Sequence, residues 1–83
     1  MSDKQKKLLY EIADLRSKRF FNNMNDHWSL DDMEFDAKCS QKIDELEEQY
    51  KSLYGNLPEW KYIDDVWDAM KVLEKELGCN DNG

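Results

Sequence analysis

The chain has 83 residues, of which 37% are charged and 40% are hydrophobic, and its formal net charge at pH 7 is −7. A chain this short forms one domain at most, and its core has to come from a few well-patterned elements. Three glycines and one proline are too few for the turns of a β-sandwich or barrel, or for a glycine-rich phosphate loop. No apolar run approaches the roughly 18 residues of a membrane span.

The first predicted helix covers residues 3–21. Its apolar residues recur at helical spacings of three and four and form one stripe: Leu8, Leu9, Ile12 and Leu15. Residues 1–19 hold six basic and three acidic residues, a net charge of +3, whereas residues 20–83 hold six basic and sixteen acidic residues, a net charge of −10. We therefore expect this helix to dock onto acidic helices, with the stems of Arg16 and Arg19 covering the edges of the core.

The second predicted helix follows the polar stretch 22–26 and runs to about Tyr54. Ser29 is a good N-cap, and Asp32 three residues later can complete a capping-box pair. Apolar residues alternate at spacings of four and three along this segment: Cys39, Ile43, Leu46, Tyr50 and Leu53. That spacing is typical of the seam of an antiparallel hairpin or coiled coil.

The apolar stripe of this second helix changes phase near Cys39, because three earlier apolar residues lie on a different face: Leu30, Met33 and Ala37. One interpretation packs these first turns against the first helix and the Phe20–Phe21 end of it. A second leaves Met33 or Phe35 exposed as an anchor for a partner or a second subunit. A third is a kink or break near Cys39–Ser40.

The third predicted helix opens at Pro58, after Gly55 has ended the second, and runs to Leu77. Its apolar arc is about 180° wide at 100° per residue and comprises Trp60, Ile63, Val66, Trp67, Met70, Leu73 and Leu77. The opposite half comprises Lys61, Asp64, Asp65, Asp68, Lys71, Val72, Lys75 and Glu76. An arc this wide can pack against two helices.

These patterns predict an all-α fold of three helices. We expect helices two and three to form a long antiparallel hairpin, with the N-terminal helix docked across it. Residues 1–78 should form a single helical domain, and residues 79–83 a disordered tail. The predicted core comprises Leu8, Ile12, Leu15, Ile43, Leu46, Tyr50, Ile63, Trp67 and Met70.

Candidate catalytic and metal-binding residues are few. The one histidine, His27, lies in a polar loop, and a pair with Cys39 is disfavoured because that thiol should face the helix seam. Cys39 and Cys79 are 40 residues apart, unlike a disulfide framework, so we expect reduced thiols and a cytoplasmic protein. No CxxC or HxxxH spacing occurs. We therefore expect no enzyme activity, no metal and no cofactor.

Acidic residues often occur in adjacent pairs, at positions 31–32, 47–48 and 64–65. Paired carboxylates serve catalysis only in a cleft that raises one pKa, so solvated helix faces are the favoured interpretation. The net charge of residues 20–83 would repel phosphate, so we expect no direct binding of nucleic acid. A protein partner with a basic surface fits this charge better.

Aromatic residues make up 12% of the chain, more than a small core needs. Trp28 and Tyr62 are the best candidates for partial exposure, and such residues are favoured at binding hot spots. The acidic side of the third helix lies beside Tyr62 and Trp60. The predicted partner-binding residues are therefore Trp60, Tyr62, Asp64, Asp65 and Asp68.

The small size, acidity and helical pattern make the chain similar in kind to bacteriocin or toxin immunity proteins and to phage-encoded inhibitors of nucleic-acid enzymes. This resemblance is one of composition and covers no motif. It implies a stoichiometric inhibitor or regulator that binds a basic surface of a nucleic-acid-handling protein. The alternative is a self-associating helical module, such as a homodimer, or a small subunit of a larger complex.

Overall fold

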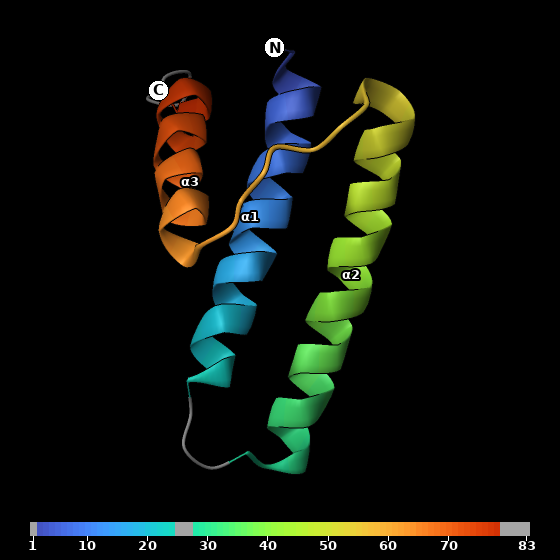
Figure 1. The fold of residues 1–83 in the computed structure, drawn as a ribbon, viewed down its shortest axis with the longest axis vertical. Coiled ribbons are helices and arrows are strands. Elements are labelled where there is room, and N and C mark those ends of the chain that lie inside the picture. Colours follow the sequence, from blue (N-terminus) through green and yellow to red (C-terminus); the bar gives the residue numbers. More distant parts are fainter. Residues whose placement is uncertain (1, 25–27, 79–83) are drawn as a thin grey trace.

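The computed structural model describes residues 2–24 and 28–78, and these form three helices and no strand. Helix α1 spans Asp3–Asn23, α2 spans Leu30–Tyr54 and α3 spans Ile63–Gly78. The three lie side by side in one layer, with α1 in the middle (Figure 1). The all-α, three-helix prediction is thus confirmed for these residues. The predicted tail, residues 79–83, lies outside them.

Helix α2 begins and ends as predicted. The Asp32 N–H donates to Ser29 Oγ at 3.2 Å, and the Ser29 N–H donates to Asp32 Oδ2 at 3.1 Å, so both halves of the capping box form. Gly55 closes the helix with φ +97°, a backbone conformation that glycine adopts without strain. The helix is continuous through Cys39, so the interpretation as a break there is wrong.

Helix α3 begins at Ile63, not at Pro58 as predicted. The cause is Asp65, whose Oδ2 accepts the backbone N–H groups of Lys61 at 3.1 Å and Tyr62 at 3.2 Å. A carboxylate at the third helical position that binds the preceding N–H groups sets the start of a helix at that point. Residues 55–62 therefore form a non-helical connecting segment.

The predicted hairpin of helices two and three is wrong in its pairing. No Cα atom of α2 lies within 8 Å of a Cα atom of α3, and both helices pack against α1. The antiparallel hairpin is formed by α1 and α2, because the short connection after α1 returns the chain directly alongside it (Figure 1). The connecting segment 55–62 then crosses one face of α1 and delivers α3 to its other side (Figure 1).

Side-chain contacts fix the antiparallel register of α1 and α2. Gln5 Nε2 donates to Tyr50 Oη at 2.8 Å near one end of the pair. Arg19 Nε donates to Asp36 Oδ1 at 2.8 Å near the other. Arg16 also forms an ion pair with Glu47 on α2. The expectation that basic residues of the first helix face acidic helices is confirmed.

On the other side of α1, two contacts set the register of α3. Lys6 Nζ lies 3.3 Å from Glu76 Oε2. Trp67 Nε1 donates to Ser17 Oγ at 3.0 Å. The Trp67 ring also stacks on Phe21 at a centroid distance of 5.7 Å and meets Phe20 edge-on at 5.9 Å. α3 is therefore antiparallel to α1 and held by its aromatic first half.

Charge gives a physical reason for the central position of α1. This helix carries six basic and three acidic residues, whereas α2 carries three and eight, and α3 carries two and five. The net charges are therefore +3, −5 and −3. A direct pairing of α2 with α3 would place like charges side by side, and α1 separates them.

The core is built on α1. The buried apolar residues are Leu8, Leu9, Ile12, Ala13, Cys39, Ile43, Leu46, Tyr50, Val66 and Leu73. Of the predicted core, Leu8, Ile12, Ile43, Leu46 and Tyr50 are buried. The others are only half-buried: Leu15, Ile63, Trp67 and Met70. No helix in the described ranges is long and apolar enough to cross a membrane.

Candidate functional site

The predicted partner-binding residues lie around the connecting segment and α3, and the structure gives them different roles. Trp60 is half-buried in the connecting segment, where it packs against the core. The Arg16 Cζ atom lies 5.9 Å from the centroid of its ring, within the range of a cation–π contact. Trp60 is therefore partly committed to holding segment 55–62 onto α1.

Asp65 also has a structural role, because its carboxylate accepts the two backbone N–H groups that begin α3. Tyr62, which supplies one of these N–H groups, leaves 73% of its surface exposed. Asp64 and Asp68 are exposed and have no ion-pair partner among the described residues. Of the three aspartates, Asp64 and Asp68 are the ones available to a partner.

An apolar hollow lies between the connecting segment and α3. Its volume is about 340 Å³, and it is lined by Leu9, Pro58, Trp60, Asp68, Ala69, Val72 and Leu73. Asp68 is the one charged residue in this lining. Val72 is 58% exposed, although it is apolar. The hollow can therefore accept an apolar side chain and offers a carboxylate at its edge.

A second hollow, which we call the polar groove, lies on the other side of Trp60. Its volume is about 350 Å³, and it is lined by Arg16, Arg19, Phe20, Asn23, Ile43, Asp44, Glu47, Trp60, Lys61, Tyr62, Ile63 and Val66. Two of its cations already pair with acids of α2, at Glu47 and Asp36. Trp60 thus joins Asp68 at the apolar hollow and Tyr62 at the polar groove.

Another exposed apolar surface lies where α1 ends and α2 begins. Nine large apolar residues are exposed within the described chain, and six fall between positions 21 and 35: Phe21, Met24, Trp28, Leu30, Met33 and Phe35. Met33 is 51% and Phe35 42% exposed. Both residues are exposed, as the second interpretation of the phase change expects, and their role as an anchor stays a prediction.

Cys39 and the acidic residues are among the described side chains that could take part in catalysis or bind a metal ion. Cys39 is buried in the α1–α2 seam, and this burial raises the pKa of its thiol. Because the thiolate is the reactive form, Cys39 is a weak nucleophile at neutral pH. Within residues 2–24 and 28–78, no three His, Cys, Asp or Glu side chains gather in a way that could hold a metal ion. His27 lies outside the described residues.

Five residues that line the apolar hollow were not among the predicted partner-binding residues: Leu9, Pro58, Ala69, Val72 and Leu73. Pro58 was assigned to a helix start, whereas it lies in the connecting segment. Val72 carried a usable signal, because it is the one apolar residue in the otherwise charged half of the third helix. An isolated exposed valine is common on protein surfaces, and only its position beside Trp60 and Asp68 gives it significance.

Comparison with known proteins finds no matching family model, no matching curated sequence and no matching solved structure.

Proposed function

We propose that this protein is a small acidic binding module, a stoichiometric inhibitor or regulator that binds a basic surface of a nucleic-acid-handling protein. The observation that carries the proposal is the apolar hollow with Asp68 at its edge. Asp64 lies one helical turn away and is exposed. An apolar anchor beside a short row of carboxylates suits a partner whose apolar side chain is flanked by lysine or arginine.

The two parts of this surface contribute differently to binding. The hollow excludes water from an inserted side chain, which slows dissociation. The carboxylates, on a chain of net charge −7, attract a basic surface over a distance and speed association. A surface that normally binds phosphates is positively charged, so an acidic module competes with nucleic acid for it.

The proposal is binding and not catalysis. Asp65 is the half-buried carboxylate of the predicted set, and it is engaged in starting α3. Cys39 is a buried free thiol, which suits the reducing cytoplasm, where we place the protein. Direct contact with nucleic acid is disfavoured by the same negative charge that favours a basic protein.

The test begins by capturing a partner on the immobilised protein at low salt and identifying it. Its association and dissociation rates are then measured against Asp64→Lys/Asp68→Lys. The matched control is Glu11→Lys/Glu74→Lys, which changes the net charge equally at two exposed residues without ion pairs in the described structure. Both double variants keep the helical circular-dichroism spectrum if they fold normally.

We expect Asp64→Lys/Asp68→Lys to slow association at least tenfold and the control to slow it much less. Rising salt should weaken the wild-type complex and reduce the difference in association rate between the two double variants. Equal losses from both variants would show that bulk charge alone matters, and the site on α3 would be wrong. Capture of a protein that is not basic, or a salt-insensitive complex, would contradict the function itself.

A further inference from the structure

The first turns of α2 present an apolar stripe that nothing in the described chain covers. Leu30 is 78% exposed, Met33 is 51% exposed, and Ala37 is also exposed. Their spacing of three and four places them on one side of the helix. No residue between positions 30 and 38 is buried, and no Cα atom of α3 lies within 8 Å of a Cα atom of α2.

Polar contacts hold this part of α2 in place. Besides the capping box at Ser29, Arg19 bonds to Asp36, and Asn22 Nδ2 donates to the Asp32 carbonyl at 3.0 Å. The helix is thus preformed while its apolar stripe stays in water. A binding surface that is already ordered loses less entropy when a partner binds.

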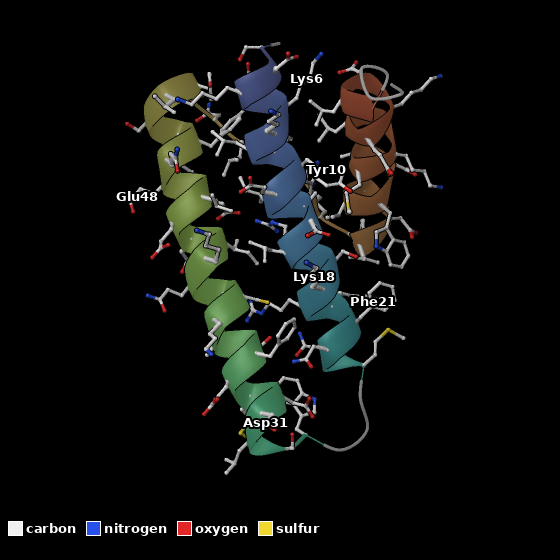
Figure 2. All side chains as sticks on the ribbon, turned by 180° about the vertical axis from the view of Figure 1, so that it is seen from behind. Lys6, Tyr10, Lys18, Phe21, Asp31 and Glu48 are labelled. Atoms are coloured by element: carbon white, nitrogen blue, oxygen red, sulfur yellow. The ribbon has the colours of Figure 1, made fainter. Side chains whose placement is uncertain are left out.

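The stripe continues along α2 as an acidic row. Leu30, Glu34, Ala37, Gln41, Asp44, Glu48 and Lys51 succeed one another at alternating spacings of four and three, and all are exposed. Figure 2 shows Glu48 on the outer side of α2, toward the end opposite Asp31. At 100° per residue, Lys38 and Lys42 lie roughly 80° and 120° around the helix from Glu48, and Lys38 is one turn from Glu34.

We name these residues the α2 docking face: Leu30, Met33, Glu34, Ala37, Gln41, Asp44 and Glu48. The face is apolar at its start and acidic at its end, and Lys51 follows it on the same side of the helix. A second copy is a poor occupant in either orientation. Antiparallel pairing would set Leu30 and Met33 against Asp44 and Glu48, and parallel pairing would set acid against acid.

We infer that the α2 docking face binds an amphipathic helix of the partner, with apolar residues opposite Leu30, Met33 and Ala37 and lysine or arginine opposite Asp44 and Glu48. This inference rests on the proposed function, because it assigns a second contact to the same basic partner. Asp44 of the α2 docking face also lines the polar groove, whose lining includes Trp60.

The test uses the full chain and a synthetic helical peptide of leucine and lysine, with leucines on one side and lysines on the other. A twin peptide with glutamate in place of lysine is the charge control. Binding is followed by amide chemical shifts of the ¹⁵N-labelled protein. The variants are Leu30→Gln/Met33→Gln on the face, Leu53→Gln as an exposed control elsewhere on α2, and Val72→Gln in the apolar hollow.

The largest shifts should fall on residues 30–48, and Leu30→Gln/Met33→Gln should weaken binding at least tenfold while Leu53→Gln leaves it unchanged. Glutamine suits an exposed helix position, so the variant should fold normally. If only Val72→Gln weakens binding, the inference is wrong and the proposed function stands. If the glutamate peptide binds as well as the lysine peptide, both are wrong. A dimer that Leu30→Gln/Met33→Gln dissociates would overturn the inference in favour of a second copy.

Discussion

Ile12 is the largest side chain in the described structure with no exposed surface. It lies in a core cluster that joins all three helices, together with Leu46 of α2 and Leu73 of α3. Ile63, by contrast, lies at the exposed start of α3 and is only half-buried. The two isoleucines therefore differ in how much apolar contact each one loses when it is shortened.

We predict that Ile12→Ala lowers the free energy of unfolding by about 2–5 kcal/mol, because the lost side chain leaves a cavity in the core. Ile63→Ala should cost clearly less, since solvent already reaches that side chain. Urea denaturation followed by circular dichroism measures both values, provided that the slope of the unfolding free energy against urea concentration is the same for each variant. Equal costs at the two positions would mean that the burial pattern along α3 is wrong.

One side chain sets the residue at which α3 begins. Ile63 would be the sixth residue of a helix that opened at Pro58, yet it is the first. The Asp65 carboxylate binds the N–H groups of Lys61 and Tyr62 and so stabilises the helix from that point. A single side chain thereby decides that Trp60 lies in a segment that crosses α1 and not on a helix.

We predict that Asp65→Ala destabilises the protein by about 1 kcal/mol, the usual effect of losing a helix-capping side chain. Amide hydrogen exchange in the first turn of α3 should speed up, while exchange in α2 stays the same. Asp64→Ala is the control. It removes an equal charge at the neighbouring position, and the Asp64 carboxylate does not bind the N–H groups that begin α3. Equal effects from both changes would mean that charge near the helix start matters and the cap does not.

The molecule as a whole is an open layer. Its radius of gyration is 13.9 Å, above the roughly 12 Å of a compact domain of this length. The open shape follows from the separation of α2 and α3, between which no two Cα atoms lie within 8 Å. It leaves room for the connecting segment to lie on one face of α1 and to form the two hollows.

We predict that the arrangement depends on which cations of α1 face α2. Arg16→Glu/Arg19→Glu turns two attractive pairs, with Glu47 and Asp36, into repulsive ones. It should lower stability by about 1–2 kcal/mol, since these pairs are partly exposed. Lys4→Glu/Lys7→Glu makes the same change in net charge at exposed positions and should cost much less.

Thermal unfolding at low and high salt measures the difference in stability between these two double variants. This difference should be smaller at high salt, because salt screens the new repulsion. A control that destabilises as much as Arg16→Glu/Arg19→Glu would show that the net charge of α1 matters and not its specific pairs.

Much of the architecture follows from local sequence. The capping box at Ser29, the stop at Gly55 and the apolar spacing of α2 are decided by residues within a few positions of each other, so they are readable without a fold. The exposure of the aspartates Asp64 and Asp68 follows from helical periodicity in the same way, whereas Tyr62 is exposed just before the helix begins.

The packing order was decided by tertiary structure. Helix α1 has a second buried line, Leu9, Ala13 and Ser17 at spacings of four, on which α3 rests. Alanine and serine add little to a hydrophobic pattern, so the sequence shows one strong stripe where the fold uses two. Small side chains matter here because they admit a neighbouring helix closely, a property that depends on the neighbour.

The candidate site also has a part that the sequence predicts and a part that only the tertiary structure reveals. Its acidic residues could be chosen from sequence because charge and spacing are local properties. The apolar hollow could not, because Leu9, Trp60 and Val72 come from α1, the connecting segment and α3 and meet only when segment 55–62 crosses α1. That crossing also keeps the two acidic helices apart, because basic α1 then lies between α2 and α3.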